Sequence, residues 1–277
     1  MIAAIPSPLD LVDLPFMRTA LAELALLAVA GGLLGTWVVL RRLAFFAHAV
    51  GTATFPGLVI AEAAGVTAQG AGLATALAYA GGVERAGKAG RGLGDAATGV
   101  LLVAALATGV ILASDVFHSG AAVDRLLFGT LLGLGRGDLV FSAAVAVLAL
   151  VATTTVGRTW TAIGFDPDSA SSLGLPSARA DLLLVGLVAV AVVAAVPAVG
   201  ALLVTSVFVV PAACARLLAD SVRAMLAWAV GVAIAQGALG LYLAYWLDTP
   251  PGPAVATLGA GVYALLAIGS AITRRQG

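Results

Sequence analysis

Long uncharged runs of Ala, Val, Leu and Gly follow one another along most of the chain, and short segments that carry the charges separate them. A helix that spans a bilayer needs about 20 mostly apolar residues. The pattern predicts nine membrane-spanning helices, near residues 19–40, 43–64, 67–82, 95–113, 139–157, 180–197, 200–215, 224–247 and 255–272. Two are weaker, because 67–82 is short and 200–215 contains Pro211. Eight spans with one re-entrant segment are the alternative.

The composition agrees with a membrane protein. Of the 277 residues, 61% are hydrophobic and 10% are charged, and the mean hydropathy is +1.10. A soluble domain has about 45–50% apolar and about 25% charged residues. The sequence therefore predicts an all-α integral membrane protein, with one transmembrane domain over residues 1–277. Because the net charge is zero, no basic patch indicates nucleic acid. A single cysteine, Cys214, excludes an intrachain disulfide.

The distribution of basic residues predicts the orientation. With nine spans, one side of the membrane holds Arg41, Arg42, Arg85, Lys88, Arg91, Arg158, Arg179, Arg216, Arg223, Arg274 and Arg275. The other side holds only Arg18, Arg125 and Arg136. Basic residues collect on the cytoplasmic side, so we expect the N-terminus outside and the C-terminus inside a bacterial cytoplasmic membrane. Removing one span would destroy this asymmetry, which favours nine.

Two connections are long and polar. Residues 114–138 carry five charges, each costing about 2.5–3.5 kcal/mol at the centre of a bilayer. We expect this segment to form an external loop with a short helix. Residues 158–178 form the longest polar connection on the predicted inner side. This segment is either a solvated loop or a short surface helix that docks a cytoplasmic partner.

The most informative polar residues within a predicted span are His48 and Thr52. Their spacing of four places both on one face of a helix, and Pro56 and Gly57 then interrupt the span. A histidine inside a membrane helix indicates a functional site, and interrupted helices often line transport sites. His48 also lies close to Arg42, so a position at the inner interface is the alternative. The span with Pro211 is a second predicted helix break.

Nothing in the sequence indicates an enzyme. The segment from Gly82 to Ala89 is close to a phosphate-binding loop, but Ala89 lacks the hydroxyl that holds Mg²⁺. There is no catalytic Ser/His/Asp set and no zinc-protease motif. Apart from Asp95 and Asp181 at the very start of their spans, Glu23 and Glu62 are the only acids within the predicted spans. This gives little support to an ion-coupled carrier, because such carriers usually need an intramembrane acid.

Six segments, in order, resemble the permease subunits of ATP-binding-cassette importers for zinc, manganese or iron. They lie at 16–46, 53–57 (ATFPG), 123–133 (VDRLLFGTLLG), 164–175 (GFDPDSASSLGL), 197–226 and 242–255, so the resemblance covers about residues 16–272. It implies an architecture similar to the vitamin B12 and siderophore permeases. It also implies a pair of permeases, two separate ATPase subunits below them, and an external substrate-binding protein. The metal ion would be the transported substrate, with no cofactor on this chain.

The resemblance also implies roles for particular residues. The segment 164–175 corresponds to the ATPase-coupling loop, with contacts expected from Asp166, Asp168, Ala170, Leu173 and Gly174.

Before its Pro-Gly pair the family usually has Gly-Asp-Ala-Leu-Ser-His-Ala, whose Asp and His form the channel metal site. Here His48 stands at the Asp position and Thr52 at the His position. A neutral histidine with a threonine suits hard Mn²⁺ less well than Asp with His. A different metal, or a metal chelate, is therefore an open alternative.

Overall fold

The computed structural model describes residues 14–89, 93–116, 126–131, 133–166 and 177–276, and in these ranges it contains helices and no strands. The all-α prediction is confirmed. The helices are α2 (Pro15–Leu40), α3 (Ala44–Ala53), α4 (Phe55–Ala64), α5 (Ala68–Ala89), α6 (Leu93–Ile111), the π-helical η1 (Leu112–Val116), α8 (Arg136–Phe165), α10 (Ser177–Val199), α11 (Val204–Leu218), α12 (Val222–Leu247) and α13 (Pro251–Gln276).

Seven segments of the described chain are long and apolar enough to cross a membrane. They are Pro15–Leu40, Ala44–Ala64, Ala96–Ser114, Arg136–Phe165, Arg179–Val199, Val222–Leu247 and Pro251–Ile272. Each corresponds to one predicted span, and α3 and α4 together form the second. The two remaining predicted spans are the two that looked weaker in the sequence. Helix α11 is apolar but has only 15 residues, and α5 is long enough but more polar.

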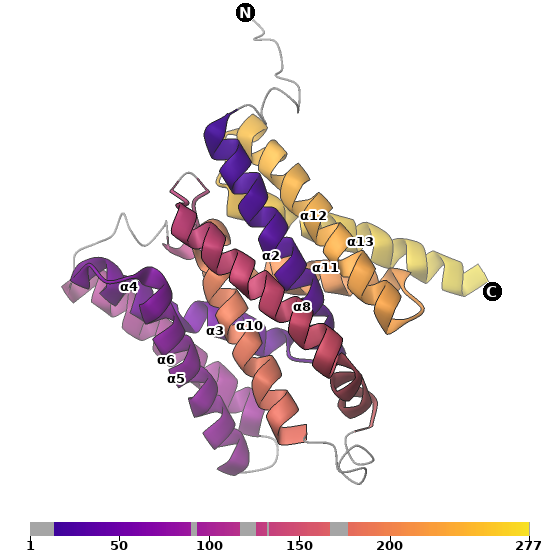
Figure 1. Ribbon diagram of the computed structural model, residues 1–277, viewed down its shortest axis with the longest axis horizontal. Coiled ribbons are helices and arrows are strands. Elements are labelled where there is room, and N and C mark those ends of the chain that lie inside the picture. The colour runs from indigo at the N-terminus through magenta and orange to yellow at the C-terminus, as the bar shows by residue number, and fades with distance from the viewer. Residues whose placement is uncertain (1–13, 90–92, 117–125, 132, 167–176, 277) are drawn as a thin grey trace, which may run out of the picture.

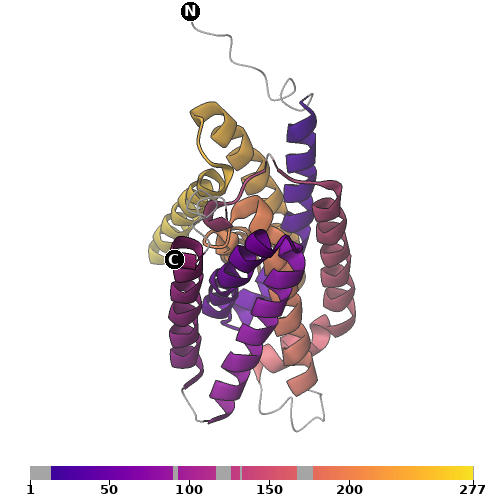
Figure 2. The same ribbon diagram turned by 90° about the vertical axis from the view of Figure 1, so that its left-hand side faces the viewer.

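The helices form two groups that meet at α10 and α3. In one group, α2 packs against α8, α11 and α12, and α13 covers α11 and α12. In the other, α4, α5 and α6 pack against one another (Figures 1 and 2). Helix α10 contacts both α8 and α5, and the short α3 contacts α5, α6, α10 and α11. The interrupted second span is therefore in the interior of the protein.

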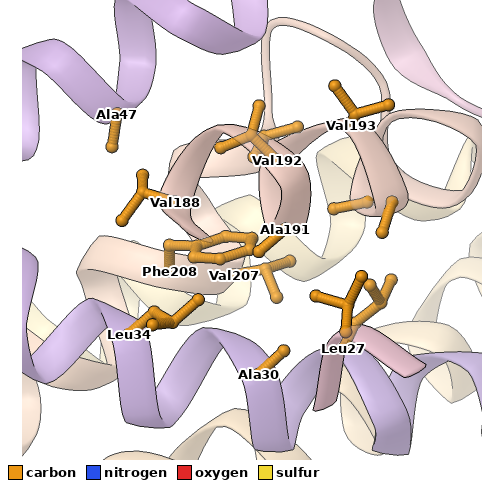
Figure 3. Close-up of a cluster of buried hydrophobic side chains, with 14 of the residues drawn as sticks. Leu27, Ala30, Leu34, Ala47, Val188, Ala191, Val192, Val193, Val207 and Phe208 are labelled. Atoms are coloured by element: carbon orange, nitrogen blue, oxygen red, sulfur yellow. The ribbon is translucent and has the colours of Figure 1, made fainter. Parts of the chain in front are cut away.

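The centre of the core lies where α2, α10 and α11 meet. Phe208 of α11 lies between Leu34 of α2 and Val188 of α10, and all three side chains are fully buried (Figure 3). The backbone of α11 comes unusually close to α2 at Gly35, where a Cβ atom would overlap with the carbonyl oxygen of Phe208. Small residues allow membrane helices to pack this closely, and the close approach increases their dispersion contacts.

The helix break expected at Pro211 is not found. Pro211 is buried inside α11, which is continuous from Val204 to Leu218. Proline removes the hydrogen bond to the carbonyl four residues earlier, which belongs to Val207, and its ring crowds the same carbonyl. Helices α2, α12 and α13 pack around α11 and stabilise it as one continuous helix.

The two polar connections are shorter than predicted. Helix α8 begins at Arg136, so Asp138 lies in its first turn instead of in a loop. There its carboxylate accepts hydrogen bonds from the Gly135 N–H at 2.9 Å and from Gln69 Nε2 at 2.6 Å. An acidic residue is favourable at a helix N-terminus. At its other end α8 continues to Phe165, into the segment predicted as the loop 158–178.

Ser142 of α8 and Glu23 of α2 form a polar pair inside the first group of helices. Ser142 Oγ donates to Glu23 Oε1 at 2.5 Å, and Glu23 is fully buried. Glu23 Oε2 is buried with no partner among the described residues. Ser142→Ala should therefore lower the free energy of unfolding by about 1–3 kcal/mol, because it leaves the whole carboxyl group unsatisfied. Thermal unfolding in detergent measures the loss.

The matched control is Glu23→Gln, which keeps an acceptor for Ser142 and should cost less than about 1 kcal/mol. Equal stability of the Ser142→Ala variant and the wild-type protein would show that this hydrogen bond does not stabilise the fold.

Candidate transport site at the interrupted span

The interruption in the second span falls at Thr54, between α3 and α4. Pro56 occupies the first turn of α4, where the missing N–H needs no partner. The Thr54 hydroxyl donates to the Gly51 carbonyl at 2.6 Å, so it satisfies a backbone group near the end of α3. Gly57 then packs α4 against α5, since a Cβ atom would lie 2.7 Å from the Ala71 carbonyl oxygen. The predicted break before Pro56 and Gly57 is therefore present, as a joint between two short helices.

His48 and Thr52 lie one turn apart near the end of α3. His48 is half-buried, whereas Thr52 is only 2% exposed. Thr52 Oγ1 donates to the backbone carbonyl of His48 at 3.3 Å, which leaves the lone pairs of its hydroxyl oxygen free to accept. The imidazole of His48 is the stronger ligand of the two. The pair therefore offers a cation two ligand atoms, one imidazole nitrogen and one weakly binding hydroxyl oxygen.

The described residues contain no group of three or more His, Cys, Asp or Glu side chains close enough to hold a metal ion. A structural zinc site typically has four protein ligands. His48 and Thr52 therefore do not form a closed metal cage by themselves. The arrangement suits brief contact with an ion that keeps other ligands or waters.

A junction of backbone segments lies next to this site, and the sequence did not indicate it. The segment 126–131 contacts the last turn of α10 and the connection between α10 and α11 through three backbone hydrogen bonds. These are Thr130 N to Pro197 O at 2.9 Å, Ala201 N to Leu126 O at 3.1 Å and Leu202 N to Leu127 O at 3.2 Å. The closest approach is at Gly129 and Gly200, which have φ of +74° and +88°. Such positive values favour glycine.

The α10–α11 connection, which forms one side of this junction, also contacts α3. A Cβ atom on Gly51 would lie 2.9 Å from the carbonyl oxygen of Ala201, so α3 packs directly on the α10–α11 connection just before Thr52. The only sequence signal for this contact is the presence of glycines at 51, 129 and 200, among 34 in the chain. The segment 126–131 is thus linked to the candidate site through main-chain contacts.

The predicted ATPase-coupling residues lie mostly outside the described residues. Asp166 ends α8 in an extended conformation, and its N–H donates to Ala162 O. Asp168, Ala170, Leu173 and Gly174 are not described. Their role stays a prediction.

Residues 13–270 match the ABC 3 transport family. The chain belongs to this family. The match spans all the described helices except the end of α13, and it confirms the resemblance that the six sequence segments indicated.

Two relatives in bacteria match nearly the whole chain. The manganese transport system membrane protein MntC of Halalkalibacterium halodurans is 28% identical over 260 residues, which are 92% of this chain and 88% of the relative. The manganese import system permease protein ScaB of Streptococcus gordonii is 26% identical over 257 residues, or 91% and 90% of the two chains. The family fold is also found in PsaBC from Streptococcus pneumoniae, solved in complex with Fab. That structure matches with a TM-score of 0.84, at 23% identity and 94% coverage of both chains.

Proposed function

We propose that this chain is the membrane permease subunit of an ATP-driven importer of a divalent metal ion, with manganese, iron and zinc as the candidate substrates. Membership of the ABC 3 transport family over residues 13–270 carries this proposal. Two relatives that match along nearly their whole length are named for manganese transport. The segment from Gly82 to Ala89 lacks the hydroxyl of a phosphate-binding loop. ATP would therefore be hydrolysed by separate partner subunits, and this chain would not be an enzyme.

In the assembled importer, two copies of the chain would pair across the membrane. The segment 167–176, with Asp168, Ala170, Leu173 and Gly174, would dock an ATPase dimer on the cytoplasmic side, and a substrate-binding protein would deliver the ion outside.

We assign nine spans, with the N-terminus outside and the C-terminus inside. Helices α5 and α11 complete this number, because a helix packed against other helices need not match the bilayer in length or apolarity. Eight of the 15 residues of α11 are buried inside the protein and therefore need no lipid contact.

Transport would use the interrupted span. The joint at Thr54 allows α3 and α4 to change their relative direction, as discontinuous helices do in other transporters. His48 would contact the ion, with the Thr52 hydroxyl beside it. Opening would alternate between the two sides as the ATPase subunits bind and hydrolyse ATP.

Uptake by the reconstituted complex tests the proposal. The chain is co-purified with its ATPase and substrate-binding protein, placed in liposomes, and supplied with Zn²⁺, Mn²⁺ or Fe²⁺. We expect uptake of one of these ions that requires ATP and the binding protein. ATP hydrolysis without uptake of any free ion would instead favour a metal chelate as substrate, which the His48 and Thr52 pair also makes reasonable. Failure to form a complex with any ATPase would contradict both versions.

A further inference from the structure

A cavity of about 640 Å³ opens where α2, α8 and α11 end together. Three arginines line it: Arg41 and Arg42, which follow α2, and Arg216, in the last turn of α11. Apolar side chains, among them Leu40, Trp160 and Phe165, form most of the remaining wall, together with Thr161 and Gly164. The described lining contains no carboxylate, so the cavity combines three guanidinium groups with apolar side chains. Asp181, outside the lining, compensates the charge of one of them, Arg41.

Arg41 has hydrogen-bonding capacity that its neighbours do not use. Its Nη2 forms an ion pair with Asp181 Oδ1 at 2.7 Å. Its Nη1 is buried and has no acceptor among the residues that the structure describes. A buried donor without an acceptor is costly. An anionic oxygen in the cavity would satisfy this group.

Arg42 occupies a backbone position where glycine is usual. Its φ is +58°, and it ends α2 in a left-handed turn in which Leu43 N donates to Val38 O at 2.8 Å. This is the turn that commonly ends helices with glycine, because a Cβ atom is unfavourable there. Backbone strain of this kind is typical of functional positions. Because this position is Arg42 and not glycine, the strained turn places a third guanidinium group at the cavity.

We propose that this cavity binds the phosphate of an anionic phospholipid headgroup. Guanidinium groups bind phosphate through paired hydrogen bonds, and basic pockets between membrane helices are typical headgroup sites. The apolar wall suits the glycerol and the upper acyl chain of the same lipid. Phe165, at the end of α8, is 73% exposed and extends this apolar surface outward. The site is separate from the interrupted span, and it does not depend on the transported substrate.

Lipid binding to the purified full-length chain tests the proposal. Native mass spectrometry compares phosphatidylglycerol with phosphatidylcholine of the same acyl chains. We expect the wild-type protein to bind phosphatidylglycerol more tightly. Combining Arg42→Gly with Arg216→Gln should weaken phosphatidylglycerol binding by roughly twenty-five-fold, at about fivefold for each arginine, and leave phosphatidylcholine binding unchanged. Arg42→Gly relieves the left-handed strain, so this double variant should remain folded, which its thermal unfolding midpoint checks.

The matched control is the double variant Arg158→Gln with Arg179→Gln, which removes two exposed arginines that do not line the cavity. It should bind phosphatidylglycerol like the wild-type protein. An equal loss in both double variants would mean that only the overall charge matters, and it would overturn the site. Equal binding of the two lipids by the wild-type protein would do the same. Displacement of phosphatidylglycerol by an equal concentration of inorganic phosphate would show a site for free anions and overturn the lipid assignment.

Discussion

Gly35→Ala is expected to be the most damaging single-methyl change in the core, lowering the free energy of unfolding by about 3 kcal/mol. The new Cβ atom would overlap with the Phe208 carbonyl oxygen and come within 3.4 Å of Ala212 Cβ. A backbone oxygen cannot rotate away as a side chain can, so α2 and α11 must separate. Because α2 also contacts α8, α10 and α12, the strain would spread through the group of helices that it holds together. Thermal unfolding in detergent, followed by size-exclusion chromatography, measures the effect.

Gly231→Ala is the matched control. Gly231 lies inside α12, and a Cβ atom there would meet nothing within 4 Å. Alanine is a better helix former than glycine by about 1 kcal/mol, so this variant should be as stable as the wild-type protein or more so. If Gly35→Ala and Gly231→Ala unfold at the same temperature, the close packing of α2 on α11 is not a source of stability.

His48→Ala should have the largest effect on transport. If His48 contacts the ion, its removal eliminates the single good nitrogen donor at the interrupted span. We expect metal uptake by the reconstituted complex to fall by roughly tenfold or more, since losing even a residue that only supports a ligand costs about 10–100-fold. The half-buried side chain can be shortened with little loss of packing, so the complex should still assemble and hydrolyse ATP.

Thr52→Val distinguishes the contribution of the Thr52 hydroxyl to metal uptake from that of the His48 imidazole. Valine has nearly the shape of threonine but lacks the hydroxyl that donates to the His48 carbonyl. A smaller loss of uptake than in His48→Ala would show that the imidazole is the main contact and the hydroxyl an accessory one. Unchanged uptake in His48→Ala, with the complex intact, would remove His48 from the mechanism and place the ion's path elsewhere.

Most of the helices were predictable because lipid imposes a simple rule on them. A segment such as 224–247 is long, apolar and uncharged, and each of these properties can be counted in the sequence. The position of the break near Pro56 followed from the backbone chemistry of proline. The same reasoning failed at Pro211, where α11 is continuous and packed between neighbouring helices. Packing against distant segments is not a local property of the sequence.

The site was less predictable than the helices. The spacing of His48 and Thr52 placed them on one helical face, but it could not show that the Thr52 hydroxyl bonds to the His48 carbonyl. The junction at Gly129 and Gly200 depends on main-chain groups, which every residue carries and which leave no pattern in the sequence. The arginines around the cavity were counted only as indicators of orientation, because Arg41, Arg42 and Arg216 become neighbours only when α2 and α11 pack together.

The contact between the segment 126–131 and the α10–α11 connection has a consequence for how such proteins diverge. Its three hydrogen bonds join main-chain atoms, so the side chains along the segment do not define the attachment. Phe128, which is 37% exposed, can therefore vary, whereas Leu126, Leu127 and Leu131 pack in the hydrophobic core. Glycines are also needed at positions 129 and 200, where the backbone is left-handed. The exposed position can therefore differ between related proteins, while the main-chain contact that connects the segment to α3 stays the same.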